Sequence, residues 1–282
     1  MVFNDAKIIQ LLVLLIAFTL FIIKNLNLVQ IKMFFKRRTS WNAIALFAVT
    51  FVAVIFTGLI GTQKAYTAPS PEAIYLSGTL RDFKDTHPDF ERTNGVDGFS
   101  YGLDNEITLN TLSSDRKPQF RGGSFSTTTQ ENFDQWYRNL PEVNQSANYT
   151  IKLDDPDGDG TYTYYNSSFF PLDDLAGFDR QGRTHDYHFT YELHTNFTYQ
   201  GGETFQFRGD DDVWVYINDR KVIDLGGVHT EKVQSVDLDA VADSIGITPG
   251  NTYNLDFFFA ERHTVHSNFK IETNIAFTQN AD

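Results

Sequence analysis

Cysteine is absent from the chain of 282 residues. A disulfide framework, a thiolate metal site and a cysteine nucleophile are therefore excluded. The HExxH, P-loop and GxGxxG patterns are also missing, so we expect neither a zinc-protease helix nor a nucleotide-binding loop. Acidic residues are so abundant that any chosen pair of carboxylates says little about catalysis. These observations favour a protein that is not an enzyme.

Basic residues are scarce in residues 69–282. The first 68 residues hold seven of the 23 Lys and Arg residues but only one of the 36 acidic residues, which leaves 16 basic and 35 acidic residues in the remainder. The net charge of that remainder is near −19. Such a field repels nucleic acid and anionic lipid and attracts cations. Nucleic acid is therefore excluded as a partner.

Two apolar runs lie in residues 1–68, at residues 8–23 and 43–60. Read from Met33, a basic head, the second apolar run and small residues up to Ala68 follow the order of a signal peptide. Alternatively, both runs cross a membrane as helices, and the basic stretch between them stays cytoplasmic. Both interpretations predict that residues 69–282 are secreted or lie at the cell surface, and that only the N-terminal segment contacts a membrane.

Residues 69–282 are predicted to form one all-β domain, an antiparallel β-sandwich. Short runs such as GETFQFRG alternate apolar and polar residues, and Gly or Pro-Gly turn signals separate them. We expect the 26 phenylalanines of the chain to fill the core between two layers. Helix signals are few; residues 237–245 predict one short helix, and residues 124–140 predict another.

Three consecutive aspartates, Asp210, Asp211 and Asp212, stand between two strand-like runs and predict the mouth of a hairpin. Adjacent carboxylates repel one another, so we expect them either in open solvent or around a cation. Calcium takes about six to eight oxygen ligands and suits clustered acids on a loop. Consecutive side chains of an extended chain point to opposite faces, so two of them can share one ion only where the backbone turns sharply, for example at a cis peptide bond. A solvated acidic turn is the alternative.

Two long stretches of sequence, RGDDDVWVYINDRKVIDLGGVH and FFFAERHTVHSNFKIETNI, closely resemble the fibro-slime domain. Four further pieces match in the same order, namely GTLRDFKDTHPDFE, FDQWYRNLPEVN, FFPLDDLAGF and HDYHFTYELHTNFTYQGGETF, so the resemblance covers about residues 76–277. This family looks like a branch of the superfamily named after the anthrax protective antigen, which includes flocculin and adhesin lectin domains. The resemblance implies a β-sandwich, an extracellular position and, in the lectin branches, calcium-assisted sugar binding.

The resemblance also implies particular calcium ligands. In those lectins an Asp–Asp pair joined by a cis peptide bond holds the ion, the ion contacts sugar hydroxyls, and an Asn from a later loop completes the site. Aligning the strand VWVYIN places the pair on Asp210 and Asp211, and a shift by one residue places it on Asp211 and Asp212. Asn268 matches the later Asn. Asp210, Asp211 and Asn268 are also the residues expected to face the sugar.

A second acidic loop follows the pattern Asp155, Asp157, Asp159, with Gly between and after them. Aspartates at alternate positions copy the first half of an EF-hand loop, and the carbonyl of Thr161 would be a further ligand. Asn166, however, stands where an EF-hand has its closing Glu. A hairpin tip with Asp and Gly at its turn positions is the alternative to a second calcium site.

Two functions are consistent with these features. The first is a calcium-dependent carbohydrate-binding or adhesion module whose partner is a glycan or a cell-surface polysaccharide. The second is a non-catalytic structural component of an extracellular matrix or cell surface, in which calcium only stabilises loops.

Glu261 and Arg262 are expected to pair with each other and to orient the loop that contains Asn268.

Overall fold

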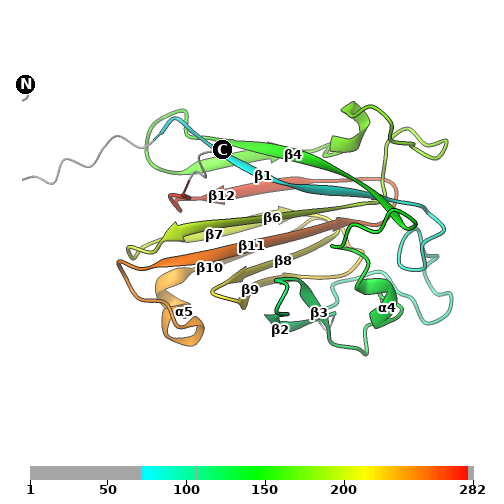
Figure 1. The fold of residues 1–282 in the computed structure, drawn as a ribbon, viewed down its shortest axis with the longest axis horizontal. Coiled ribbons are helices and arrows are strands. Elements are labelled where there is room, and N and C mark those ends of the chain that lie inside the picture. Colours follow the sequence, from blue (N-terminus) through cyan, green and yellow to red (C-terminus); the bar gives the residue numbers. More distant parts are fainter. Residues whose placement is uncertain (1–70, 106, 279–282) are drawn as a thin grey trace, which may run out of the picture. The chain divides into compact units, whose positions relative to one another are not determined.

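The structure is a computed structural model that describes residues 71–105 and 107–278 (Figure 1). Strands dominate this part of the chain, which confirms the mostly β class. The strands are β1 (Ala73–Phe83), β2 (Thr108–Leu112), β3 (Pro118–Phe120), β4 (Asn144–Asp154), β5 (Tyr162–Asn166), β6 (Phe189–Thr198), β7 (Thr204–Gly209), β8 (Asp212–Ile217), β9 (Arg220–Leu225), β10 (Lys232–Asp237), β11 (Thr252–Glu261) and β12 (Phe269–Thr273). The helical segments are α4 (Gln130–Phe133), the 3-10 turn η1 (Pro171–Asp174) and α5 (Leu238–Ile245), and α4 and α5 lie within the two ranges predicted to be helical.

The predicted signal or membrane segment, with both of its apolar runs, lies outside the described residues. Within the described ranges, no helix is long and apolar enough to cross a membrane. The two interpretations of the N-terminal segment and the boundary between residues 68 and 69 therefore stay predictions.

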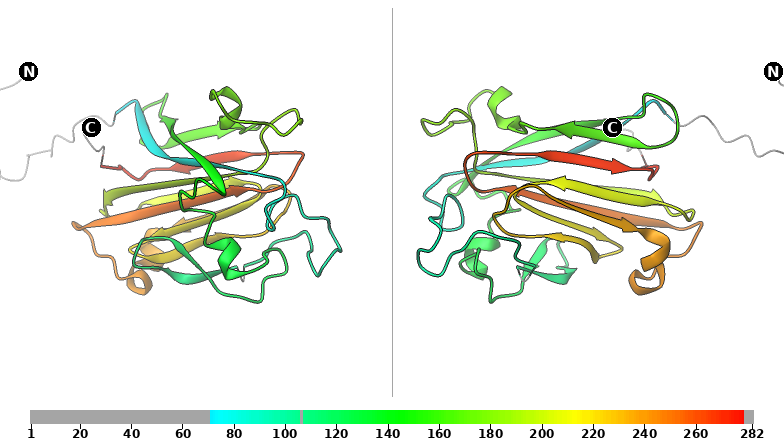
Figure 2. Two further views of the ribbon diagram at one scale, coloured as in Figure 1. Left: turned by 45° about the vertical axis from the view of Figure 1, so that its right-hand side comes forward. Right: turned by 180° about the vertical axis from the view of Figure 1, so that it is seen from behind.

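The strands form one antiparallel sheet in the order β10-β7-β12-β5-β4-β1-β6-β11-β8-β9-β2-β3. The longest pairing joins β1 and β4, from Ala73 opposite Asp154 to Phe83 opposite Asn144. The sheet curls, so that β7 and β12 of one half face β11 of the other half (Figures 1 and 2). The sequence predicted a sandwich of two layers; in the structure the layers are the two halves of a single sheet.

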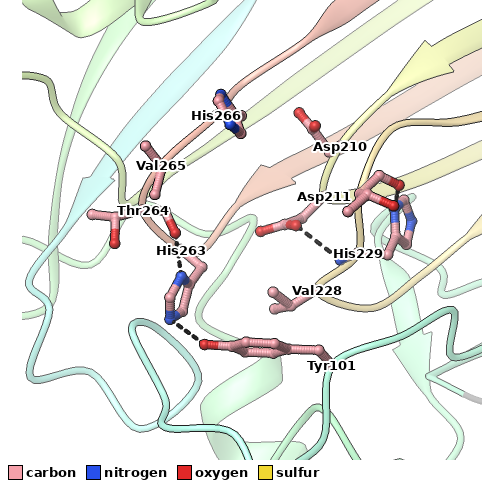
Figure 3. Close-up of a pocket in the computed structure, with 10 residues that line it drawn as sticks. Tyr101, Asp210, Asp211, Val228, His229, His263, Thr264, Val265 and His266 are labelled. Atoms are coloured by element: carbon pink, nitrogen blue, oxygen red, sulfur yellow. Dashed lines mark hydrogen bonds between the residues drawn. The ribbon is translucent and has the colours of Figure 1, made fainter.

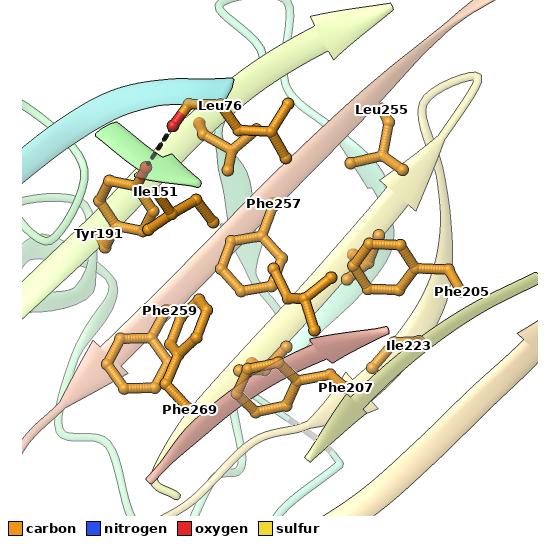
Figure 4. Close-up of a cluster of buried hydrophobic side chains, with 14 of the residues drawn as sticks. Leu76, Ile151, Tyr191, Phe205, Phe207, Ile223, Leu255, Phe257, Phe259 and Phe269 are labelled. Carbon is orange, nitrogen blue, oxygen red and sulfur yellow. Dashed lines mark hydrogen bonds between the residues drawn. The ribbon is translucent and has the colours of Figure 1, made fainter. Parts of the chain in front are cut away.

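Aromatic rings fill the space between the two halves (Figure 4). The ring centroid of Phe207 in β7 lies 5.8 Å from that of Phe257 and 6.2 Å from that of Phe259, both in β11. Phe269 of β12 lies 5.2 Å from Phe259. In β7 the buried Phe205 and Phe207 alternate with more exposed residues, as the period-two pattern predicted. This aromatic core fixes the distance between the halves, and with it the two chain segments that cross between them.

A second core covers the outer face of β8 and β11. Trp214 and Tyr216 of β8 belong to it, and Trp214 lies 5.8 Å from Phe133 and 6.2 Å from Trp136 between ring centroids. Every residue of β8 is therefore buried, because one face meets the inner core and the other meets this cluster. Because both faces of such a strand are covered, its sequence is a continuous run of apolar residues, as in VWVYI.

Candidate functional site

The aspartate triplet does not form the mouth of a hairpin, so that prediction is wrong. β7 pairs with β10 and β12, whereas β8 pairs with β9 and β11. The chain crosses from one half of the sheet to the other at Asp210 and Asp211. Residues 262–268 cross in the opposite direction, from β11 to β12. The two crossings meet because β12 pairs with β7 and β8 pairs with β11.

Asp210 is held against Asn268 of the second crossing. The backbone N–H of Asn268 donates to Asp210 Oδ1 at 2.6 Å, and the side-chain Nδ2 donates to Asp210 Oδ2 at 2.9 Å. The backbone N–H of Asp210 donates in turn to the carbonyl of Asn268 at 3.3 Å. The structure thus brings together two residues that are 58 positions apart and that the sequence placed in one site.

Asp211 is held by two backbone N–H groups. His229 donates to its Oδ1 at 3.0 Å, and Arg262 donates to its Oδ2 at 3.3 Å. The peptide bond between Asp210 and Asp211 is cis, so the pair named first by the alignment, and not Asp211–Asp212, has the bond expected from the resemblance. Both side chains are 5% exposed, which leaves only a narrow face of each toward solvent.

Asp212 has a different position from its neighbours. Its carboxylate accepts from Arg262 Nε at 2.6 Å and from Arg262 Nη2 at 3.1 Å, and the N–H of Gly227 donates to it at 2.5 Å. Both Asp212 and Arg262 are fully buried. Asp212 does not line the pocket described below, because β8 begins at this residue and directs its side chain away from the crossing. We therefore do not retain it as a ligand of the proposed ion.

The predicted pairing of Glu261 with Arg262 is wrong, because Arg262 pairs with Asp212. Its guanidinium also donates through Nη1 to the carbonyls of Ser126 at 2.6 Å and Asp89 at 3.3 Å, and it lies 4.8 Å over the ring of Trp136. Arg262 thus fixes the start of the second crossing to β8 and to the outer core.

An open pocket of about 230 Å³ lies at the aspartate pair (Figure 3). Its lining comes from Tyr101 and from residues 210–211, 228–230 and 263–266. The phenol of Tyr101 and Nε2 of His263 are 2.7 Å apart, so a loop before β2 is tied to the second crossing. Tyr101 is 41% exposed and Val265 is 68% exposed, so the pocket offers apolar surface beside its carboxylates.

The electrostatics of the pocket favour a cation. Burial raises the pKa of Asp211 well above its ordinary value, the charge of Asp212 raises it further, and the guanidinium of Arg262 opposes these effects only in part. A cation near a carboxylate favours its charged form and removes this cost. Each of the four oxygens of the pair accepts one N–H group, and a carboxylate has about four acceptor positions, so each oxygen keeps capacity for an ion. With the amide oxygen of Asn268 the donors are all oxygen, which fits calcium.

The second acidic loop is the tip of the β4–β5 hairpin. Asp155, Asp157 and Asp159 each place a carboxylate oxygen within 4.8 Å of the others. Asp155 is 2% exposed and accepts the N–H groups of Gly158 at 2.9 Å and Gly160 at 3.0 Å, and Asp159 accepts the N–H of Thr161 at 2.7 Å. These bonds are those of an acidic turn, and the side-chain spacing is also compatible with a cation. Both interpretations of this loop stay open.

Residues 98–102, GFSYG, match the GxSxG pattern of serine hydrolases. In hydrolases that serine stands on a sharp turn between a strand and a helix. Here the segment runs through turns and irregular chain, and the hydroxyl of Ser100 donates to the carbonyl of Tyr101 at 3.3 Å. The arrangement supplies no nucleophile elbow.

Tyr101, Val228 and His229 were missed by the sequence analysis. They come from loops far from the triplet along the chain, and each is one aromatic, aliphatic or histidine residue among many. No local pattern marks such residues as pocket-lining, because the chain crossings bring them together.

Comparison with known proteins finds a match to a domain family in part of the chain. Residues 180–280 match the PA14 domain. The match runs through β6–β12 and includes both crossings, and thus Asp210, Asp211 and Asn268. It supports the broader superfamily indicated by the sequence, whereas the narrower fibro-slime name stays a prediction.

The chain is also similar to psi proteins of Dictyostelium discoideum. Protein psiC is 37% identical over 224 residues, which are 73% of this chain and 42% of that protein. Protein psiR is 38% identical over 211 residues, or 68% of this chain and 20% of that protein. Protein psiE is 51% identical over 126 residues, or 41% of this chain and 24% of that protein. The chain thus spans less than half the length of each of these relatives.

Among solved structures, similarity extends to two PA14 domains. The PA14 sugar-binding domain from an RTX adhesin aligns with 72% of this chain and 94% of that chain, with 11% identity and a TM-score of 0.28. The PA14 domain of the MpAFP antifreeze protein aligns with 77% and 89%, with 10% identity and a TM-score of 0.28. A likeness at this level carries no conclusion about the ligand.

Proposed function

We propose that residues 69–282 are an extracellular carbohydrate-binding or adhesion module without catalytic activity. In this proposal a calcium ion is held by Asp210, Asp211 and Asn268 and leaves positions open toward the pocket, where vicinal hydroxyl groups of a sugar bind. The observation that carries the proposal is that two buried carboxylates line an open pocket and that the amide of Asn268 is hydrogen-bonded to one of them. The match to the PA14 domain and the resemblance to calcium-dependent lectins support it.

The walls of the pocket fit the other face of a sugar. A pyranose has polar hydroxyl edges and an apolar face of C–H groups, and Tyr and His rings commonly contact such amphipathic ligands. The Tyr101 ring, fixed by its bond to His263, and the aliphatic Val228 and Val265 supply this surface. We expect the ion to fix the hydroxyls and the loops to select among sugars.

A glycan array of the purified full-length chain in a non-glycosidic detergent tests the proposal. Binding is expected with calcium and is expected to disappear with a chelator and in Asp211→Asn. The matched control is Asp243→Asn, an exposed acid on α5 outside the pocket, which should bind as the wild-type chain does.

Two results would contradict the proposed mechanism. Glycan binding that survives both the chelator and Asp211→Asn would remove the ion from the recognition step. A chain that calcium stabilises against heat, but that binds no glycan on the array, would favour the structural matrix component instead.

A further inference from the structure

Strand β4 carries two acceptor motifs for N-linked glycosylation. The pattern Asn-x-Ser/Thr occurs as NQS from Asn144 and as NYT from Asn148, and two further motifs begin at the half-buried Asn166 and Asn196. In the eukaryotic secretory pathway such a motif accepts an oligosaccharide on the amide nitrogen of its Asn. The psi proteins that the chain resembles come from Dictyostelium discoideum, a eukaryote. Only about 13 Å of extended strand separates Asn144 from Asn148, and the structure gives them opposite environments.

Asn144 cannot carry a glycan in this fold. The residue is 7% exposed, and its side chain is bonded to the segment that follows α4. Both hydrogens of its Nδ2 are used, because this nitrogen donates to the carbonyl of Arg138 at 2.9 Å and to that of Gln135 at 3.4 Å. Its Oδ1 accepts the N–H of Leu140 at 3.3 Å. An N-linked sugar replaces one of these hydrogens and adds a ring at a buried nitrogen, so the first motif is closed.

Asn148 is open to solvent on the same strand. Asn148 and Thr150, the hydroxyl residue of its motif, are both exposed and alternate with the more buried Tyr149 and Ile151, so both side chains lie on the outer face of the sheet. Within residues 71–105 and 107–278, the amide group of Asn148 has no hydrogen-bond partner. Replacing one of its amide hydrogens by a sugar therefore breaks no bond of the fold.

The surroundings of Asn148 leave room for a bulky group. Strand β1 pairs with β4 along its whole length, whereas β5 joins β4 only at Asp154 opposite Thr163. At Asn148 the strand thus has a paired neighbour on one side only. The pocket at the aspartate pair takes no residue from β1 or β4, so a glycan at Asn148 is separate from the proposed binding site.

We propose that Asn148 carries an N-linked glycan and that Asn144 stays unmodified. The amide nitrogen of Asn148 bonds to the anomeric carbon of the first sugar, and the bond from that carbon to the pyrophosphate of a lipid-linked oligosaccharide breaks. The lipid pyrophosphate leaves with the bonding electron pair, and the nitrogen gives one proton to a base of the transferase. A chain modified at Asn144 cannot bury that side chain and does not reach this fold. The inference rests on the extracellular position in the proposed function, but not on the calcium ion or on the pocket.

Mass spectrometry of the full-length chain, exported by cultured eukaryotic cells, tests the proposal. Peptide N-glycosidase in heavy-oxygen water converts a glycosylated Asn into a labelled Asp, and a sample without the enzyme controls for spontaneous deamidation. Cleavage after Arg138 and Lys152 leaves both motifs in one peptide, whose fragment ions locate the label. We expect the label at Asn148 and none above background at Asn144.

The matched control is Ser146→Thr, which gives both motifs the same hydroxyl residue at an exposed position. The label should stay at Asn148 alone, because burial and not the hydroxyl residue closes the motif of Asn144. The double variant Ser146→Thr/Asn148→Gln leaves Asn144 as the only acceptor on β4, and the exported chain should carry no label there. A label at Asn144 in any exported chain overturns the proposal.

The remaining outcomes separate this inference from the proposed function. If the wild-type chain reaches neither the medium nor the cell surface and has no label, the extracellular position fails together with this inference. If the wild-type chain is exported and Asn148 has no label, this inference alone fails, whatever the pocket binds.

Discussion

Asp82, near the end of β1, shows how burial alters an acidic side chain in this protein. The residue is 6% exposed, and its Oδ1 has no hydrogen-bond partner. Burial raises the pKa of Asp82 to about 8, and the nearby Asp186 adds to the shift. The pKa of an unfolded Asp is about 4, so folding favours the protonated form of this side chain.

The substitution Asp82→Asn should therefore stabilise the protein at pH 8 more than at pH 5. With a raised folded-state pKa, Asp82 contributes its full stability below about pH 4, and that contribution is lost as the pH rises through about 8. Asn cannot ionise, so the variant should gain at least about 1 kcal/mol over wild type between the two pH values, given about 1.4 kcal/mol per pKa unit.

Thermal or denaturant unfolding at both pH values measures this gain. Asp243→Asn is the control, because it makes the same substitution at an exposed acid on α5. A difference between Asp82→Asn and wild type that is the same at pH 5 and pH 8 would show that Asp82 does not titrate in this range.

Single residues of the site were predictable only in part. Asp210 and Asp211 could be named because three adjacent carboxylates are a rare local pattern, and Asn268 because the resemblance supplied it. The role of Asp212 could not be predicted, since it depends on a buried ion pair with Arg262, 50 residues away.

The positions of the strands along the sequence were easier to predict than the pairing of the strands in the sheet. The alternation in β7 and the apolar run of β8 follow from burial on one face and on two faces, which are local properties. The partner of a strand is not a local property: nothing in GETFQFRG or VWVYI states that β7 and β8 belong to different halves of the sheet. The hairpin expected at the triplet was wrong for this reason.

Gly209 at the end of β7 provides a test of how the two crossings are joined. A Cβ atom there would lie 2.1 Å from the carbonyl oxygen of Asn268, which is backbone and cannot rotate away. Gly209→Ala should therefore separate β12 from β7, destabilise the protein by about 1–3 kcal/mol and weaken calcium binding through the lost contact of Asn268 with Asp210.

Chemical denaturation and calorimetry measure the two effects of Gly209→Ala. The neighbouring Arg208→Ala is the control, because this side chain points to the exposed face and its solvent-exposed ion pair with Glu231 contributes little to stability. If Gly209→Ala behaves like the control in both measurements, the close approach of the strands does not determine the site.

At the scale of the whole molecule, the curled sheet explains why the site lies where it does. The inner aromatic core holds the two halves face to face, so the β7–β8 and β11–β12 crossings must bridge them at one end. The outer core, which includes Trp136 and Trp214, packs over β8 and β11, and Arg262 connects it to the start of the second crossing. The site is thus built on segments that two cores keep in place.

The charge of the molecule fits the same account. A net charge near −19 over residues 69–282 attracts cations in general. Within the described residues, the two candidate calcium sites are the aspartate pair at the pocket and the loop that holds Asp155, Asp157 and Asp159. A decisive experiment has to separate the two.

Calorimetric titration of the full-length chain with calcium is that experiment. We compare wild type with the double variants Asp210→Asn/Asp211→Asn and Asp157→Asn/Asp159→Asn. We predict that wild type binds calcium, that the first variant loses a binding event, and that the second variant keeps that event. If wild type binds no calcium, or if the first variant binds as wild type does, the account of the site is contradicted.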